Sequence, residues 1–100
     1  MDRSRFHASL SEDAPPNELS DLLQALWHDA RGEWDRAHAI VQAQSGAEAC
    51  AVHAYLHRKE GDLSNADYWY GRARRSRPAT GLQAEWQALV DVLLAGPGRE

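Results

Sequence analysis

Residues 54–73 of the chain read AYLHRKEGDLSNADYWYGRA. The middle of this stretch contains Gly61-Asp62, a pair that is typical of a tight corner between two helices. After the corner, small and apolar side chains recur at helical spacing: Leu63, Ala66, Tyr70 and Ala73. The stretch therefore predicts a helical hairpin, in which one helix ends near Glu60 and the next begins near Asp62.

The same pattern occurs once before, 29 residues earlier in the chain. Five positions correspond: Ala25, His28, Gly32, Trp34 and Ala37 in the first copy, and Ala54, His57, Gly61, Leu63 and Ala66 in the second. A single hairpin cannot bury its own apolar face, so repeated hairpins are expected to pack against each other. The sequence thus predicts two stacked hairpins as the centre of the fold.

The apolar pattern on either side of the repeat extends this prediction to five helices. The spacing of apolar residues predicts helices over about 17–31, from about 34 to Gly46, over 47–60, over about 62–76, and from Thr80 to Gly96. Thr80 and Gln83 have the spacing of a capping box at the start of the last helix. Residues 1–16 lack a sustained apolar period and end in Pro15-Pro16, which favours a flexible lead. We therefore expect an all-α domain over residues 17–96 and a short tail over 97–100.

Composition excludes several classes of protein. The chain has 100 residues, a net charge of −4 and one cysteine, Cys50, which cannot form an internal disulfide. No apolar run approaches the roughly 18 residues that cross a bilayer, and no secretory signal is recognisable. These features predict a soluble, cytoplasmic protein with no membrane partner.

The second hairpin resembles the tetratricopeptide repeat. The family's second helix carries an alanine, an aromatic residue four positions later and a proline after the helix ends, which here are Ala66, Tyr70 and Pro78. The first hairpin is a divergent copy, with Val41 in place of the aromatic residue and no proline. The resemblance implies a right-handed stack of two hairpins, with the last helix acting as a C-terminal cap.

The family resemblance also implies a binding module for a protein or peptide. In that family the first helices of the hairpins line a concave face. Carried over to this chain, the contact residues are Leu26, Asp29, Tyr55, Arg58 and Lys59. Arg58 and Lys59 could hold a carboxylate of an acidic partner, although they could equally complement the C-terminal end of their own helix. No cofactor is predicted.

The histidines suggest an alternative function. His53 and His57 are spaced i, i+4 on one helix face, where two imidazoles can share a metal, and Cys50 lies on the same face. His28 occupies the position in the first hairpin that His57 has in the second. Three interpretations remain open for His28, His53 and His57: packed and hydrogen-bonded histidines, a pH-sensitive or ligand-contacting group, and a metal site formed by Cys50, His53 and His57.

The remaining sequence patterns give weaker indications of function. The run RARRSR over 72–77 could contact phosphates, but the acidic remainder of the chain argues against nucleic acid as a partner. No phosphate-binding loop, nucleophile elbow or zinc-protease motif is present, so the sequence contains no catalytic signature.

Overall fold

The computed structural model describes residues 1–96, which form six α-helices and no β-strand. The helices are α1 (Arg3–Ser9), α2 (Asp21–Ala30), α3 (Trp34–Gln42), α4 (Ala47–Lys59), α5 (Leu63–Arg72) and α6 (Leu82–Ala95). The all-α prediction is confirmed. The expected number of five helices is not, because α1 lies within the segment that was expected to be a flexible lead. The predicted tail over 97–100 lies outside the described residues.

Two inter-helix corners repeat the same backbone geometry. Gly32 follows α2 with a φ of 81°, and Gly61 follows α4 with a φ of 90°, both in the left-handed region that favours glycine. In each corner the amide after the glycine donates to the carbonyl of a histidine, His28 or His57, at 3.0 Å. This is the Schellman pattern of helix termination. The 29-residue repeat in the sequence therefore corresponds to a repeated helix end.

Capping side chains set where individual helices begin. Ser20 accepts a hydrogen bond from the Leu23 amide, so α2 begins at Asp21, four residues later than the apolar pattern indicated. Asp62 caps α5, because its side chain accepts a hydrogen bond from the Asn65 amide. The capping box predicted at Thr80 is wrong, because the N-cap of α6 is Gly81 and no side chain makes a cap hydrogen bond there.

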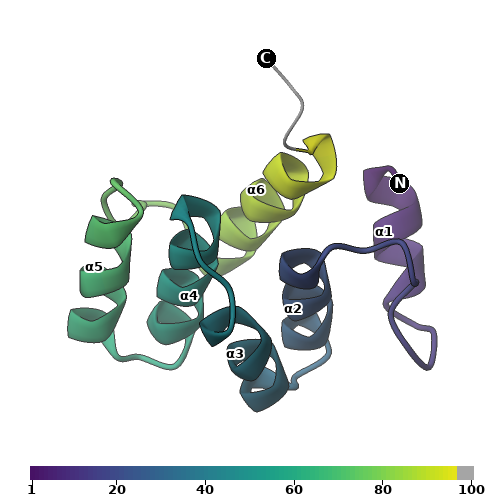
Figure 1. The fold of residues 1–100 in the computed structure, drawn as a ribbon, viewed down its shortest axis with the longest axis horizontal. Helices are drawn as coiled ribbons and strands as arrows, with labels where there is room; N and C mark the ends of the chain where they lie inside the picture. The colour runs from purple at the N-terminus through teal and green to yellow at the C-terminus, as the bar shows by residue number, and fades with distance from the viewer. Residues whose placement is uncertain (97–100) are drawn as a thin grey trace.

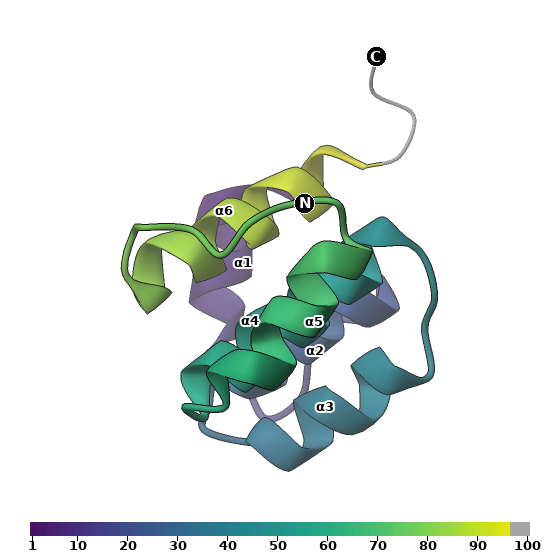
Figure 2. The ribbon, with the colours of Figure 1, turned by 90° about the vertical axis from the view of Figure 1, so that its left-hand side faces the viewer.

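The helices pack around α4. In Figure 1 the helices α5, α4, α2 and α1 follow one another from left to right, and α3 lies in front of the gap between α4 and α2. Helix α6 packs across both α2 and α4, as the rotated view in Figure 2 also shows. Every side chain from Ala49 to His57 is buried, so α4 is enclosed on all sides. Among residues 1–96, no helix combines the length and the apolar character needed to cross a bilayer.

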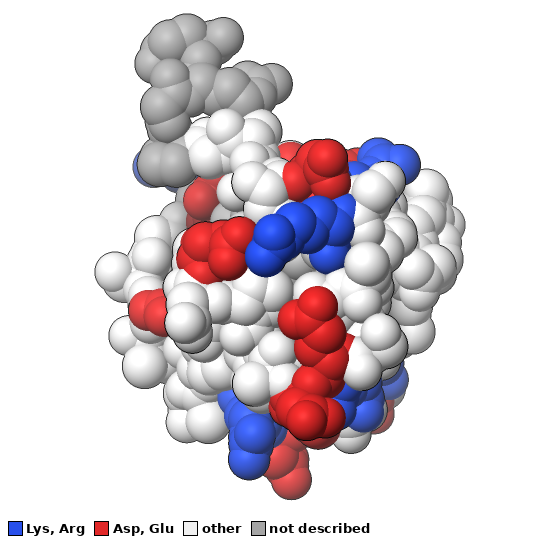
Figure 3. Space-filling view, turned by 90° about the vertical axis from the view of Figure 1, so that its right-hand side faces the viewer, with Lys and Arg blue, Asp and Glu red and all other residues white. Residues whose placement is uncertain are grey.

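Residues 1–16 contain a docked helix in place of the flexible lead expected from the sequence. Asp2 caps α1, and Phe6 is fully buried with its ring centroid 5.9 Å from that of Trp86 on α6. Trp27 of α2 donates its indole N–H to the hydroxyl and the carbonyl of Ser9. Figure 3 shows the face of the molecule that carries α1, where acidic and basic groups lie interspersed. An ion pair between Arg3 and Asp91 joins α1 to α6.

The end of α5 stores backbone strain. Arg74 has a φ of 62° and is the only residue other than glycine with a positive φ in the described part of the chain. The amide of Arg75 donates to the carbonyl of Tyr70, so Arg74 occupies the position that glycine fills at the two other corners. A side chain in this conformation costs roughly 1–2 kcal/mol.

We expect Arg74→Gly to stabilise the protein. Relief of the strained backbone outweighs the extra chain entropy of glycine, roughly 0.5–1 kcal/mol, and leaves a net gain of about 0.5–1 kcal/mol in the free energy of unfolding. Urea denaturation followed by circular dichroism measures the difference. Arg75→Gly is the matched control, because it removes a neighbouring cation where φ is not positive and should give no gain. An equal gain from both variants would assign the effect to charge.

Candidate metal centre

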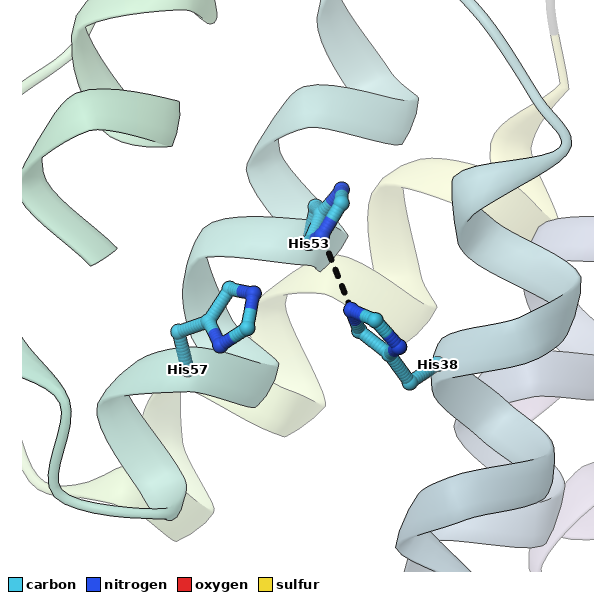
Figure 4. A group of neighbouring side chains, drawn as sticks. All are labelled: His38, His53 and His57. Carbon is cyan, nitrogen blue, oxygen red and sulfur yellow. Dashed lines mark hydrogen bonds between the residues drawn. The ribbon is translucent and has the colours of Figure 1, made fainter. Parts of the chain in front are cut away.

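Three histidines from two helices converge between α3 and α4. His53 and His57 lie one turn apart on α4, and His38 reaches them from α3 (Figure 4). One ring nitrogen from each lies within 4.8 Å of the other two. The Nε2 atoms of His38 and His53 are 3.1 Å apart and share a hydrogen bond. The side chains thus bring three potential nitrogen ligands to one point.

Neighbouring side chains fix the three rings. His57 donates from Nδ1 to a carboxylate oxygen of Glu60 at 2.5 Å, which leaves its Nε2 free of that contact. Trp34 stacks on His38 with ring centroids 4.8 Å apart, and Trp69 stacks on His53 at 4.0 Å. A carboxylate on the outer nitrogen of an imidazole orients the ring and raises its basicity toward a metal.

The electrostatics of the cluster favour neutral imidazoles. Burial, together with the nearby rings of His38 and His57, lowers the pKa of His53 to about 4. Burial also lowers the pKa of His38, with His57 contributing. At neutral pH these two rings are therefore uncharged, and each keeps one nitrogen lone pair, which is the form that binds a metal.

The spacing of the nitrogens fits a small tetrahedral ion. Zinc–nitrogen bonds of about 2.0–2.1 Å place two ligands of a tetrahedral centre about 3.3–3.4 Å apart. The 3.1 Å between the His38 and His53 nitrogens is close to this edge, and the His57 nitrogen lies within 4.8 Å of both. His38 is only partly buried, which leaves the cluster open to solvent on the side of α3.

The structure brings together only part of the predicted metal set. His53 and His57 lie in the cluster as expected, but Cys50 does not belong to it and is a buried thiol in the core. His28 lies outside the cluster too, since its Nδ1 contacts Glu33 at 2.6 Å in the first hairpin. Sequence reasoning missed His38. Its signal was the i, i+4 spacing from Trp34 along the face of α3 that turns toward α4.

The residues predicted to line a peptide groove lie mainly in the interior. Leu26 is fully buried, and Tyr55 is 2% exposed. Tyr55 donates to one oxygen of buried Asp29 at 2.7 Å, and Lys59 donates to the other at 2.9 Å. Burial and the carboxylate of Asp29 raise the pKa of the Tyr55 hydroxyl. The structure brings Asp29, Tyr55 and Lys59 together, but as an internal network.

Arg58 is also engaged within the protein. Its guanidinium donates to Glu85 of α6 at 2.7 Å and to the carbonyl of Thr80. Tyr70 donates to the second oxygen of the same carboxylate at 2.6 Å. Because α6 covers α2 and α4, the face that the family resemblance assigned to a peptide is occupied by the chain's own last helix. The prediction of a peptide groove gains no support from this arrangement.

Comparison of the chain with models of protein families, with curated proteins and with solved structures found no match. The resemblance to the tetratricopeptide repeat therefore has no support beyond the residues that suggested it.

Proposed function

We propose that this protein binds one divalent transition-metal ion, preferably zinc, through His38, His53 and His57. The observation that carries this proposal is the convergence of three ring nitrogens within 4.8 Å. Imidazole is a favoured ligand of zinc, copper and nickel, and three protein ligands leave a fourth position for water or an outside donor. Glu60 supplies the carboxylate contact that metal-bound histidines usually make.

Metal binding would join the two hairpins. His38 belongs to the first hairpin, whereas His53 and His57 belong to the second. An ion held by all three would bind the folded chain more tightly than the unfolded chain, in which the ligands are far apart. Free metal at 100 times its dissociation constant would then stabilise the fold by about 2.7 kcal/mol.

The first test is a zinc titration of tag-free protein by isothermal calorimetry at pH 7.5. We expect one site per chain, and we expect His38→Ala to weaken binding by more than about 100-fold, since loss of a direct ligand costs more than loss of a supporting contact. His38 is the residue of choice because it is only partly buried, so the variant keeps its core. Circular dichroism checks that the variant is folded.

Two matched variants make the assignment specific. His28→Ala removes a buried histidine at the position in the first hairpin that His57 has in the second. Like His57 it contacts a glutamate, but it lies outside the cluster. Cys50→Ser removes the thiol. Both should bind zinc as the natural chain does. The proposal fails if His38→Ala retains full affinity, if His28→Ala loses it, or if the natural chain binds no stoichiometric zinc.

A further inference from the structure

Lys59 is the only lysine of the chain, among ten arginines, and it lies beside a hollow between four helices. The hollow has a volume of about 350 Å³. Helices α1, α2, α4 and α6 supply its walls, and the residues that matter for its chemistry are His7, Leu10, Asp29, Lys59, Gln83 and Trp86. The space is large enough for a small organic molecule.

The hollow is distinct from the histidine cluster. Tyr55 and Lys59 stand two residues after His53 and His57 on α4. Two residues correspond to a rotation of about 200° around a helix, so the two sets of side chains point to opposite sides of α4. A ligand in the hollow would therefore not touch the metal centre.

In the hollow, the ammonium group of Lys59 can donate to a ligand, whereas the carboxylate of Asp29 is already occupied. Asp29 is 1% exposed, and its two carboxylate oxygens accept from Tyr55 and Lys59. The ammonium group of Lys59 has three hydrogens, of which one bonds to this carboxylate and a second reaches the Asp29 carbonyl at 3.5 Å. One hydrogen is left for a ligand, whereas the buried carboxylate has no free oxygen to offer a cation.

The remaining walls add a second donor and an apolar surface. Gln83 is exposed and lines the hollow; its side-chain amide makes no hydrogen bond within residues 1–96, so it can donate. Trp86 and Leu10 present apolar groups, and the ring of His7 lies 5.7 Å from that of Trp86. A ligand that uses all these features carries an anionic oxygen group at one end and a flat apolar body at the other.

We infer that this hollow is a binding site for a small aromatic carboxylate. The carboxylate accepts from Lys59 and Gln83, because charge-assisted bonds to an ammonium are stronger than neutral ones. The ring of the ligand packs against Trp86 and Leu10. At the binding efficiency typical of small organic ligands, a ligand the size of benzoate would bind with a dissociation constant of about 0.5–10 mM.

The test uses sodium benzoate as the probe and the indole N–H signals of the four tryptophans in a two-dimensional ¹⁵N–¹H NMR spectrum as the readout. Benzoate should shift the signal of Trp86 in a saturable way. The signals of Trp34 and Trp69, which belong to the metal centre, should not change. Benzamide has the same size but no charge, and it should bind at least about tenfold more weakly.

Variants then assign the contact to Lys59. We expect Lys59→Met to weaken benzoate binding at least about tenfold, whereas Arg36→Met, which removes a cation from α3, should change nothing. If Lys59→Met fails to fold because Asp29 loses its partner, Gln83→Ala replaces it, since Gln83 is exposed, and this variant should weaken binding about threefold.

Three results would overturn the inference: equal binding of benzoate and benzamide, unchanged binding in Lys59→Met or in its replacement Gln83→Ala, and no saturable shift of Trp86 up to about 50 mM benzoate, well above the expected dissociation constant. Loss of zinc binding in His38→Ala would leave the benzoate result unaffected, so the two proposals stand or fall separately.

Discussion

Replacing Phe6 by alanine is expected to lower the free energy of unfolding by about 3–5 kcal/mol. The side chain is fully buried, packs beside the ring of Trp86 and joins the main core cluster. Its removal would leave a cavity between α1 and α6 and loosen the packing of α1 on both α2 and α6. Since small domains are stable by about 5–15 kcal/mol in total, the loss would be a large share.

Urea denaturation measures this loss, and two variants test its cause. Phe6→Leu keeps most of the apolar volume and should cost clearly less than Phe6→Ala. Arg5→Ala changes an exposed neighbour on α1 and should leave the urea concentration at the midpoint of unfolding almost unchanged. If Phe6→Ala were as mild as Arg5→Ala, then α1 would not be part of the folded core in solution.

Replacing Glu85 by alanine is expected to cost a similar amount, about 3–5 kcal/mol, for an electrostatic reason. Glu85 is 5% exposed and accepts from both Arg58 and Tyr70. Its removal leaves the largely buried guanidinium of Arg58 without a counter-charge and the Tyr70 hydroxyl without an acceptor. The desolvation of these groups on folding would then no longer be offset by the ion pair and the hydrogen bond.

The matched control is Asp67→Ala. Asp67 also pairs with an arginine, Arg77, through two hydrogen bonds, but both side chains are exposed. Exposed pairs contribute little because water and salt screen them, so this variant should unfold at nearly the same urea concentration as the natural chain. A cost for Glu85→Ala no greater than that for Asp67→Ala would mean that the buried pair is not needed for stability.

Local signals in the sequence were enough to locate the hairpins. The glycine corners and the apolar spacing predicted α2 to α6. Both signals are local, because Gly32 and Gly61 determine the backbone at their own positions and periodic burial is visible within one helix. The same spacing placed His53 and His57 on one face, where the structure has them. These features depend on residues within a few positions of each other.

Tertiary contacts decided what the sequence did not reveal. Helix α1 has seven residues and buries one large apolar side chain, Phe6, so its sequence shows no apolar periodicity. Contacts with α2 and α6 stabilise it. His38 became a cluster member through the packing of α3 on α4. Arg58, which the family resemblance assigned to a peptide groove, instead pairs with Glu85, 27 residues away on α6, and such a distant partner leaves no local signal.

The enclosure of α4 has a consequence for how the chain unfolds. Stacked hairpins in long repeat arrays can open one unit at a time, since each unit contacts only its neighbours. Here the two buried carboxylates, Asp29 and Glu85, tie α4 to α2 and α6 through Lys59 and Arg58. Separation of α4 from either side would break one of these buried pairs. We therefore expect the amide hydrogens at its centre to exchange with solvent only when the entire domain opens.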